Sequence, residues 1–461
     1  MGGSVIAAIV AGVVLTAVAF AHAIGPALML VAVTPFDAIP WALFGVAGNL
    51  ITYVPVIIFL LKVNPGYWGQ AFLGTRVQQW IAFFILVLLV SHAMLIVEKG
   101  IGEILEWLRK VTLFLLMGIF AWALRDGKQI RLLVQVAVIS MTAFVVLSAM
   151  DFYLGIQLLP IKAGLLESAA LDTEFEQHLA THWRFTGAGF PVNRFSNYLL
   201  PLIFLSVGWF AAGGSPLERT LSLGCTATLI AAELLTVTRS GILGMGVGLM
   251  IMLPMAFRVR PAQVVGLALV AGAVGLIAWY VVGVTSGGEV LAKRFDAGHV
   301  VQSTGGRFDR MLAAFQIWSE APILGVGWGA FTDYSVLYVK DTGGKGAHNG
   351  YLNVLAECGL LGFIPLMIVV VSVVRRHLVK IGTLSPDHEF WRPFFFCGLA
   401  SQLVTNVFND YMWERYLWLN FAFVVVLEQV YRYEMARTAR ERLVGIRDLG
   451  SRLGSPQTRP S

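Results

Sequence analysis

Charged residues are scarce in this sequence: they make up 13% of its 461 residues, whereas hydrophobic residues make up 57%. The mean hydropathy is +0.75. A soluble domain of this size does not have such a composition, so that class of protein is excluded. Apolar runs of about 17 to 25 residues, long enough to cross a bilayer, recur along almost the whole length. The composition therefore predicts an all-α, polytopic integral membrane protein.

Cysteine is also rare. The three cysteines, Cys225, Cys358 and Cys397, fall in or at the ends of apolar runs, and no Cys-x-x-Cys pair is present. This pattern indicates neither a disulfide framework nor a metal site. The amino terminus lacks a basic segment and a small-residue cleavage site, so we expect an uncleaved first span. No internal repeat is visible.

The apolar runs predict about 12 transmembrane helices. The first run is long, and we expect a bend near Gly25 and Pro26; two spans in its place would move the amino terminus to the other side of the membrane. The expected spans are residues 4–33, 41–61, 78–97, 108–124, 132–150, 196–212, 220–237, 242–257, 262–283, 358–374, 392–408 and 416–431.

Lysine and arginine near span ends resist translocation, so their positions predict the orientation. Seven arginines follow residue 431, and the connectors with Arg125, Arg258 and Arg375 fall on the same side. We therefore expect both termini in the cytoplasm, a single transmembrane domain over 1–431 and a basic cytoplasmic tail over 432–461. Two hydrophilic loops, about 151–195 and 284–357, then face outward, as does the turn at 409–415.

The net charge of +6 is mostly a consequence of this positive-inside bias. It does not indicate nucleic acid as a partner. A basic tail next to the last span is more simply explained by contact with lipid headgroups.

The larger outward loop contains a predicted amphipathic helix that begins near Ser303 and Thr304 and ends before Pro322. Its arginines, Arg307 and Arg310, are three residues apart and share one side. We expect this helix to lie at the membrane interface. Paired guanidinium groups at that depth suit a phosphate or pyrophosphate; the alternative is that they only anchor the helix. The apolar face is made of Phe308, Met311, Leu312 and Phe315.

The glycine-rich run GVGWGAF at 325–331 resembles a dinucleotide fingerprint only superficially, because no βαβ unit surrounds it. Tight turns and close backbone packing explain it better.

His348 follows in the segment AHNGYL. A histidine can exchange a proton near neutral pH, as the activation of a sugar hydroxyl requires; the alternative is a structural or solvated side chain. Arg239, in TVTRSG, lies between apolar runs, where a guanidinium needs an anion or a carboxylate. Glu233 is the carboxylate alternative. Arg184 and Asn193, in WRFTGAGFPVN, end the other outward loop.

Four motifs together resemble the O-antigen ligase family, which also includes O-antigen and exopolysaccharide polymerases. They are RFTG at 184–187, TRSG at 238–241, GGR with its helix and PILGVGWGAF, and HNGYLNVLAECGLLG from residue 348. The resemblance extends over about 184–420.

This resemblance implies a GT-C-type glycosyltransferase of the bacterial inner membrane that acts at the periplasmic face. Its donor is a glycan on undecaprenyl pyrophosphate, its acceptor is lipid A-core or a lipid-linked glycan, and the inverting reaction uses no metal or other cofactor. By analogy, Arg239 and Arg307 hold the pyrophosphate, and His348 acts as base or positioner for the acceptor hydroxyl. Further substrate-binding candidates are Arg184, Arg310, Asn349 and Asn193.

The resemblance does not separate a ligase from a polymerase, since both use the same donor and the same kind of site. We favour a ligase. A transporter or flippase is a less favoured alternative, because transporters commonly show inverted repeats and interrupted helices.

Overall fold

The structure is a computed structural model. It describes residues 16, 21–22, 24–36, 50–100, 102–124, 126–156, 185–188, 190–260, 262–263, 297–339, 346–378, 386–412 and 414–453. Arg184, most of the expected span at 262–283 and parts of both outward loops lie outside these ranges.

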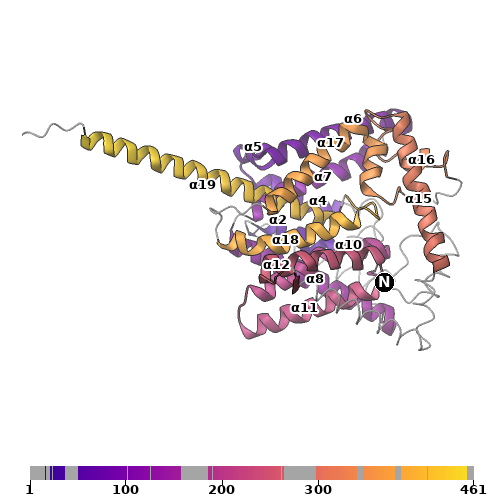
Figure 1. Ribbon diagram of the computed structural model, residues 1–461, viewed down its shortest axis with the longest axis horizontal. Coiled ribbons are helices and arrows are strands. Elements are labelled where there is room, and N and C mark those ends of the chain that lie inside the picture. Colours follow the sequence, from indigo (N-terminus) through magenta and orange to yellow (C-terminus); the bar gives the residue numbers. More distant parts are fainter. Residues whose placement is uncertain are drawn as a thin grey trace, which may run out of the picture.

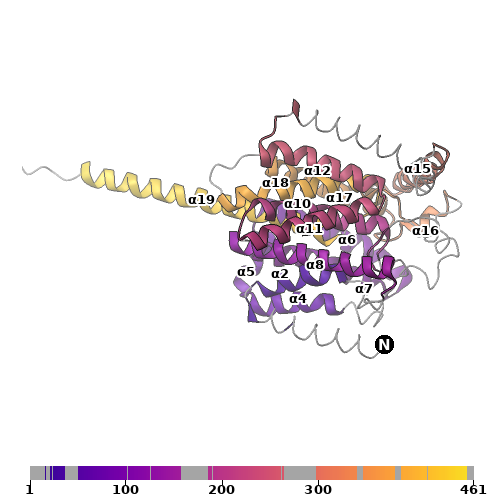
Figure 2. The same ribbon diagram turned by 90° about the horizontal axis from the view of Figure 1, so that it is seen from below.

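The described residues form a bundle of roughly parallel and antiparallel helices (Figures 1 and 2). All elements assigned in these residues are helices. In chain order they are α2 (Gly25–Val33), the 3-10 helix η1 (Thr34–Phe36), α4 (Leu50–Lys62), α5 (Pro65–Leu73), α6 (Arg76–Lys99), α7 (Gly102–Ala123), α8 (Gly127–Leu154), α10 (Val192–Ala211), α11 (Pro216–Leu235), α12 (Arg239–Phe257), α15 (Ala297–Glu320), α16 (Phe331–Ser335), α17 (Gly350–Leu378), α18 (Pro386–Thr405) and α19 (Arg415–Leu453).

Four helical segments of the described residues are long and apolar enough to cross a membrane: Arg76–Val97, Gly127–Leu154, Arg239–Phe257 and Gly350–Leu378. They include the spans expected at 78–97, 132–150, 242–257 and 358–374. Shorter apolar helices run over Gly25–Phe36, Tyr53–Lys62 and Thr112–Ala123. The helical class and the multi-pass character are thereby supported; the number of about 12 spans stays a prediction.

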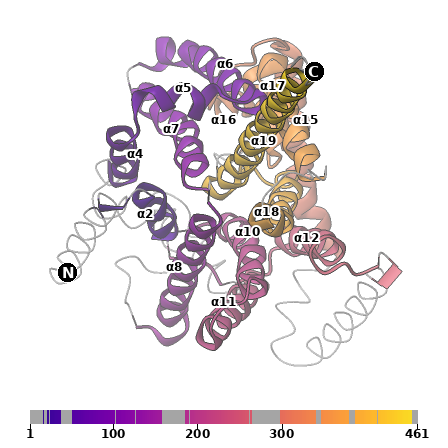
Figure 3. The ribbon, with the colours of Figure 1, turned by 90° about the vertical axis from the view of Figure 1, so that its left-hand side faces the viewer.

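Two helices distinguish the ends of the bundle. α15 runs across one end, roughly perpendicular to the bundle helices, and α19 projects far beyond the opposite end (Figures 1 and 2). We call these the α15 end and the α19 end. Figure 3 looks along the bundle from the α19 end. α19 is one helix from Arg415 to Leu453, without a break at residue 431.

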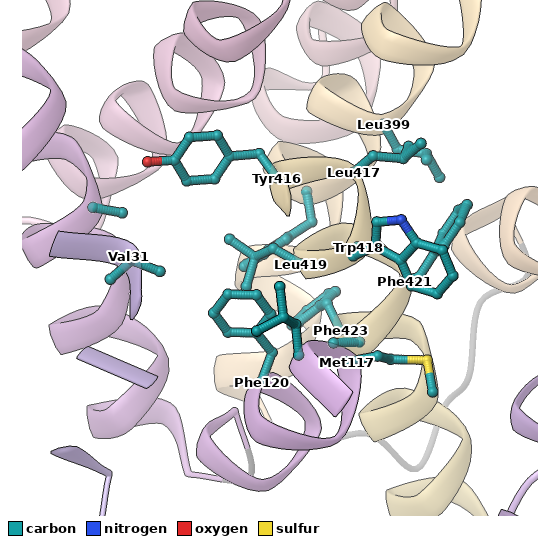
Figure 4. Packing of buried hydrophobic residues seen from close by; sticks show 14 of the residues in the cluster. Val31, Met117, Phe120, Leu399, Tyr416, Leu417, Trp418, Leu419, Phe421 and Phe423 are labelled. Carbon is teal, nitrogen blue, oxygen red and sulfur yellow. The ribbon is translucent and has the colours of Figure 1, made fainter. Parts of the chain in front are cut away.

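The core of the bundle lies around the first half of α19, where Tyr416, Leu417 and Leu419 are almost fully buried. Phe423 of α19 stacks on Phe395 of α18, with ring centroids 4.1 Å apart. Phe120 of α7 enters the same cluster (Figure 4). Within a membrane the surrounding lipid is as apolar as these side chains, so the hydrophobic effect does not bring helices together. Close packing of this kind then stabilises the contacts between them.

Several helices begin or end at residues that the sequence marks as helix caps or helix breakers. Asp126 caps α8 by accepting a hydrogen bond from the Lys128 N–H (2.8 Å). Ser215 and Glu218 form a reciprocal capping box at the start of α11. Such caps satisfy backbone donors that a helix leaves open. The helix expected to begin near Ser303 begins earlier, at Ala297, and ends before Pro322 as predicted.

Candidate functional site

Arg239 is the first residue of α12 and is positioned by a tight turn after α11. Thr236 Oγ1 donates to the Glu233 carbonyl (2.7 Å) and accepts from the Thr238 N–H (3.2 Å). Val237, between them, has a φ of 49°, a left-handed conformation that a β-branched residue rarely adopts. The turn therefore stores backbone strain where it presents the Arg239 side chain.

Gly241 allows α12 to start against two neighbouring helices. A Cβ at this glycine would lie 2.0 Å from Ser196 Oγ of α10 and 2.1 Å from Glu233 Oε1 of α11. Real Cβ atoms do not approach other atoms so closely, so an alanine here requires these groups to move. The glycine of the TRSG motif thus has a packing role.

Glu233 is completely buried, and its Oε1 accepts a hydrogen bond from Ser196 Oγ (2.7 Å). Its carboxyl group therefore connects α11 to α10. These contacts do not support the alternative in which Glu233 forms an ion pair with Arg239.

Arg307 and Arg310 lie on the side of α15 that faces the protein. Ala314 and Ile317, which continue this side at helical spacing, are almost fully buried in a small cluster with Phe331 and Ala356 of α16 and α17. The two guanidinium groups are thus held beside a packed helix interface and not on its exposed side.

Burial lowers the pKa of the Arg307 guanidinium, and the positive charge of Arg239 lowers that pKa further. Tyr411 acts in the opposite direction, and the charge of Arg310 again lowers the pKa. These influences require proximity, since a charge interaction weakens with distance. The structure therefore brings together arginines from α12 and α15 and a tyrosine from the turn between α18 and α19.

His348 lies in the turn that leads into α17, and its φ of 53° is left-handed. The Ala347 N–H donates to Asn353 Oδ1 (3.4 Å), and the Gly350 N–H donates to the carbonyls of Asn406 and Asn409 (2.8 and 2.9 Å). These bonds hold both sides of the histidine. The imidazole is half-buried.

The segment 406–411, between α18 and α19, joins the separate parts of the site. Its Asn409 Nδ2 donates to Ser240 Oγ (2.9 Å), next to Arg239. Asp410 lies close to the histidine turn, because a Cβ at Gly346 would be 3.1 Å from Asp410 Oδ2. With Tyr411 beside Arg307, this one segment reaches Arg307 itself and residues next to Arg239 and His348. Arg239, Arg307 and His348 consequently converge on the α15 end.

The sequence pattern did not identify Asn409, Asp410 or Tyr411 as members of the site. Its only signal was the predicted outward turn at 409–415. No spacing rule relates this turn to the arginine and histidine motifs, which are far away in the sequence.

The glycine-rich loop after α15 fixes that helix against α17. Gly325 and Gly359 both have left-handed φ values, 70° and 58°. A Cβ at Gly325 would lie 2.3 Å from the Glu357 carbonyl carbon, and one at Gly359 would lie 2.3 Å from the Ile323 oxygen. The expectation of tight turns and close backbone packing is confirmed.

Helix α6 supports the same loop. Ser91 Oγ donates to the Glu357 carbonyl (2.8 Å), and His92 Nδ1 lies 2.7 Å from the Trp328 carbonyl oxygen. The Glu357 Oε1 accepts from the Phe331 N–H (3.2 Å). The loop that follows α15 is therefore held by hydrogen bonds between side chains of α6 and α17 and backbone groups.

The remaining predicted residues are placed differently. Asn349 Oδ1 accepts hydrogen bonds from the N–H groups of Tyr351 and Leu352, both at 3.0 Å, so it caps α17. Asn193 is half-buried in the first turn of α10. Arg184 is outside the described residues, although the next residue, Phe185, donates to the Leu235 carbonyl beside the Arg239 turn.

Arg194, the neighbour of Asn193, has a structural role. Its Nε donates to Glu414 Oε1 at 2.8 Å, and its guanidinium lies 5.9 Å from the ring centroids of Phe190 and Tyr198. Glu414 is buried. This ion pair ties the start of α10 to the turn before α19.

In the part of the chain that the structure describes, no group of three or more His, Cys, Asp or Glu side chains is arranged to hold a metal ion. The three cysteines are buried and are not joined by a disulfide bond. The cationic groups of the site are suited to an anionic ligand.

Residues 224–367 match the family model described as O-Antigen ligase. This region includes Arg239, Arg307, Arg310, His348 and Asn349, whereas Arg184 and Asn193 lie before it. No curated protein matches the chain. The resemblance seen in the motifs is confirmed over these residues.

Proposed function

Because residues 224–367 carry an O-antigen ligase domain, we propose that this membrane protein transfers a glycan from undecaprenyl pyrophosphate to the hydroxyl group of lipid A-core. The convergence of Arg239, Arg307 and His348 from three separate segments is the observation that supports this proposal. Two cations and a histidine at the same end of the bundle suit a reaction that expels a pyrophosphate and deprotonates an alcohol.

In the proposed reaction, the acceptor oxygen attacks the anomeric carbon while the bond from that carbon to the pyrophosphate oxygen breaks. The carbon is inverted, and undecaprenyl pyrophosphate leaves with the bonding electrons. The acceptor proton passes to His348. Arg239 and Arg307 stabilise the charge that develops on the leaving pyrophosphate. This role suits guanidinium, which makes paired, charge-assisted hydrogen bonds to phosphate.

Arg310 would assist Arg307 from the same side of α15, and Asn193 and Arg184 would contact the glycan or the pyrophosphate. For Asn349 a structural role is already visible, so we propose that its effect on substrate is through the turn that it caps. No cofactor is part of the proposed reaction.

The proposed topology places the α15 end in the periplasm and both termini in the cytoplasm. Arg131, Arg376 and Arg432 all interact near the α19 end: Arg432 donates to the Gly74 carbonyl, and the other two form ion pairs with Glu218 and Glu428. Positive residues concentrate on the cytoplasmic side of membrane proteins. We propose a transmembrane domain over 1–431 and a cytoplasmic tail over 432–461 in the bacterial inner membrane.

The alternative is an O-antigen or exopolysaccharide polymerase, which would pass the glycan to another lipid-linked repeat. The donor site would be identical, so the arginines and the histidine do not separate the two reactions. The acceptor does.

The test uses purified protein in detergent with EDTA and an undecaprenyl pyrophosphate-linked glycan from the native host. Lipid A-core is added to one of two reactions, and the products are separated on a carbohydrate gel. Product that forms only with lipid A-core supports the ligase. A ladder of longer lipid-linked chains without lipid A-core supports the polymerase. Absence of product from folded protein with a verified donor contradicts both.

A further inference from the structure

Helix α15 has two apolar sides, and only one of them is covered by protein. The inward side carries Ala313, Ala314 and Ile317, which are almost fully buried. The outward side carries Phe308, Leu312 and Phe315, which are 65%, 47% and 51% exposed. At about 100° per residue, these three positions form one narrow stripe roughly opposite Ile317. A solvated helix would carry polar residues on that stripe.

The outward stripe is continued by the loop that follows α15. Trp318 packs on Phe315, with ring centroids 5.1 Å apart, and its Nε1 donates to the Pro322 carbonyl. Ile323 and Leu324 come next and are exposed by 63% and 37%. The apolar surface therefore does not end with the helix.

This loop is joined directly to a candidate membrane span. The N–H groups of Leu360 and Leu361 in α17 donate to the carbonyls of Pro322 and Ile323 at 2.9 and 3.1 Å. The outward side of α17 continues with exposed Leu360, Leu361 and Ile364. Since α17 is long and apolar enough to cross a membrane, exposed aliphatic side chains on it face lipid. The surface of α15 is continuous with that lipid-facing surface.

The orientation of α15 suits the same partner. The helix crosses the end of the bundle instead of running along it (Figures 1 and 2). A helix in this orientation lies along the membrane surface, where aromatic side chains are favoured. If a second copy of the protein covered the stripe on α15, that stripe would not need to continue onto the exposed side of α17.

We propose that the outward stripe of α15, made of Phe308, Leu312 and Phe315 and continued by Ile323 and Leu324, is inserted into the bilayer surface at the α15 end. The partner is the boundary between lipid headgroups and acyl chains. The same helix then carries Arg307 about 100° around from Phe308, toward the protein-facing side. Lipid on one side and α17 on the other fix the depth of that guanidinium.

The test measures the surroundings of single nitroxide labels in protein reconstituted into phospholipid nanodiscs. Labels are attached to Phe308→Cys, Leu312→Cys and Phe315→Cys. Matched controls are Asp309→Cys and Gln316→Cys, which are exposed positions about 100° around the helix from Phe308 and Phe315. The native cysteines are buried, so wild-type protein serves as the labelling blank.

At the three stripe positions, we expect collisions with oxygen, which concentrates in lipid, to exceed collisions with a water-soluble nickel chelate several-fold. At Asp309 and Gln316 the order should reverse. Stripe labels that collide with the nickel chelate as often as the controls do would overturn the proposal, because the stripe would be in water. Protection of the stripe from both reagents would also overturn it, since protein would then cover the stripe.

This measurement does not depend on glycan transfer, so it stands apart from the proposed function. A second measurement connects the lipid contact of α15 with the proposed glycan transfer. If both are correct, Leu312→Glu should raise the KM for the lipid-linked donor several-fold while the folded protein stays in the membrane. Oxygen accessibility as predicted with an unchanged KM would retain the lipid contact and contradict the claim that this contact sets the depth of Arg307 for the donor.

Discussion

Arg239 of α12 lies close enough to Arg307 of α15 for its positive charge to lower the Arg307 pKa beyond the effect of burial. Two like charges in proximity repel each other, and the repulsion is strongest where water is displaced. Such an arrangement is stabilised by an anion. A pyrophosphate between the two guanidinium groups would convert the repulsion into two attractive contacts.

Arg307→Ala should lower the transfer rate by about 10²- to 10³-fold, as the loss of one stabilising donor to a developing oxyanion does. Arg239→Ala should have a comparable effect. Arg307→Lys should restore little, since an ammonium group does not make the paired contact of a guanidinium. Transfer is measured with purified protein, and membrane levels of each variant serve as the control. Wild-type rates in both alanine variants would contradict the assignment of the pyrophosphate site.

Gly241→Ala should impair transfer because its new Cβ displaces Ser196 and Glu233 and shifts the first turn of α12, which begins with Arg239. Gly246→Ala is the matched control on the same helix, since no atom lies within 4 Å of a Cβ at that position. The control should retain wild-type transfer. Equal activities of the two variants would show that the Gly241 contact does not position Arg239.

His348 requires separate tests of its backbone and its side chain, because its φ is left-handed. Glycine adopts this conformation without strain, so His348→Gly preserves the turn and removes only the imidazole. We expect His348→Gly and His348→Ala both to lose transfer, by about 10²- to 10⁴-fold for a general base. Transfer by His348→Gly at the wild-type rate would leave the histidine without a chemical role.

Asn349→Ala should destabilise the protein by about 1 kcal/mol, the usual cost of losing a helix cap. Asn349→Asp keeps an acceptor for the two N–H groups and should restore thermal stability. The measurement is the melting temperature of each variant in detergent beside its transfer rate. If Asn349→Asp is stable yet inactive, the amide contacts substrate; if it is stable and active, capping explains the residue.

The sequence predicts the helices of this fold better than it predicts their contacts. Long apolar runs identify α6, α8, α12 and α17, because each must satisfy its own backbone hydrogen bonds in lipid. The turns around Gly325 and Gly359 follow from glycine's tolerance of left-handed φ values. The role of Asn409 in holding the Arg239 turn has no such signal, since it depends on which helix ends meet.

The amphipathic helix shows the same limit. Its apolar stripe at Phe308, Leu312 and Phe315 is visible in the sequence, and so is the pair of arginines. The protein-facing side carries small, buried residues, Ala313 and Ala314, which allow close approach to neighbouring elements. The bond between Glu233 and Ser196 is a different case, because α10 and α11 follow each other in the chain and a short connection makes such helices neighbours.

The central claim is that the paired arginines hold a pyrophosphate leaving group during glycan transfer. Its most direct test compares undecaprenyl pyrophosphate released with glycan transferred, by wild-type protein and by Arg307→Ala, in detergent with EDTA and a native donor. The account predicts equal amounts of both products for the wild type and loss of both in the variant. Equal release and transfer by Arg307→Ala at the wild-type rate would contradict it.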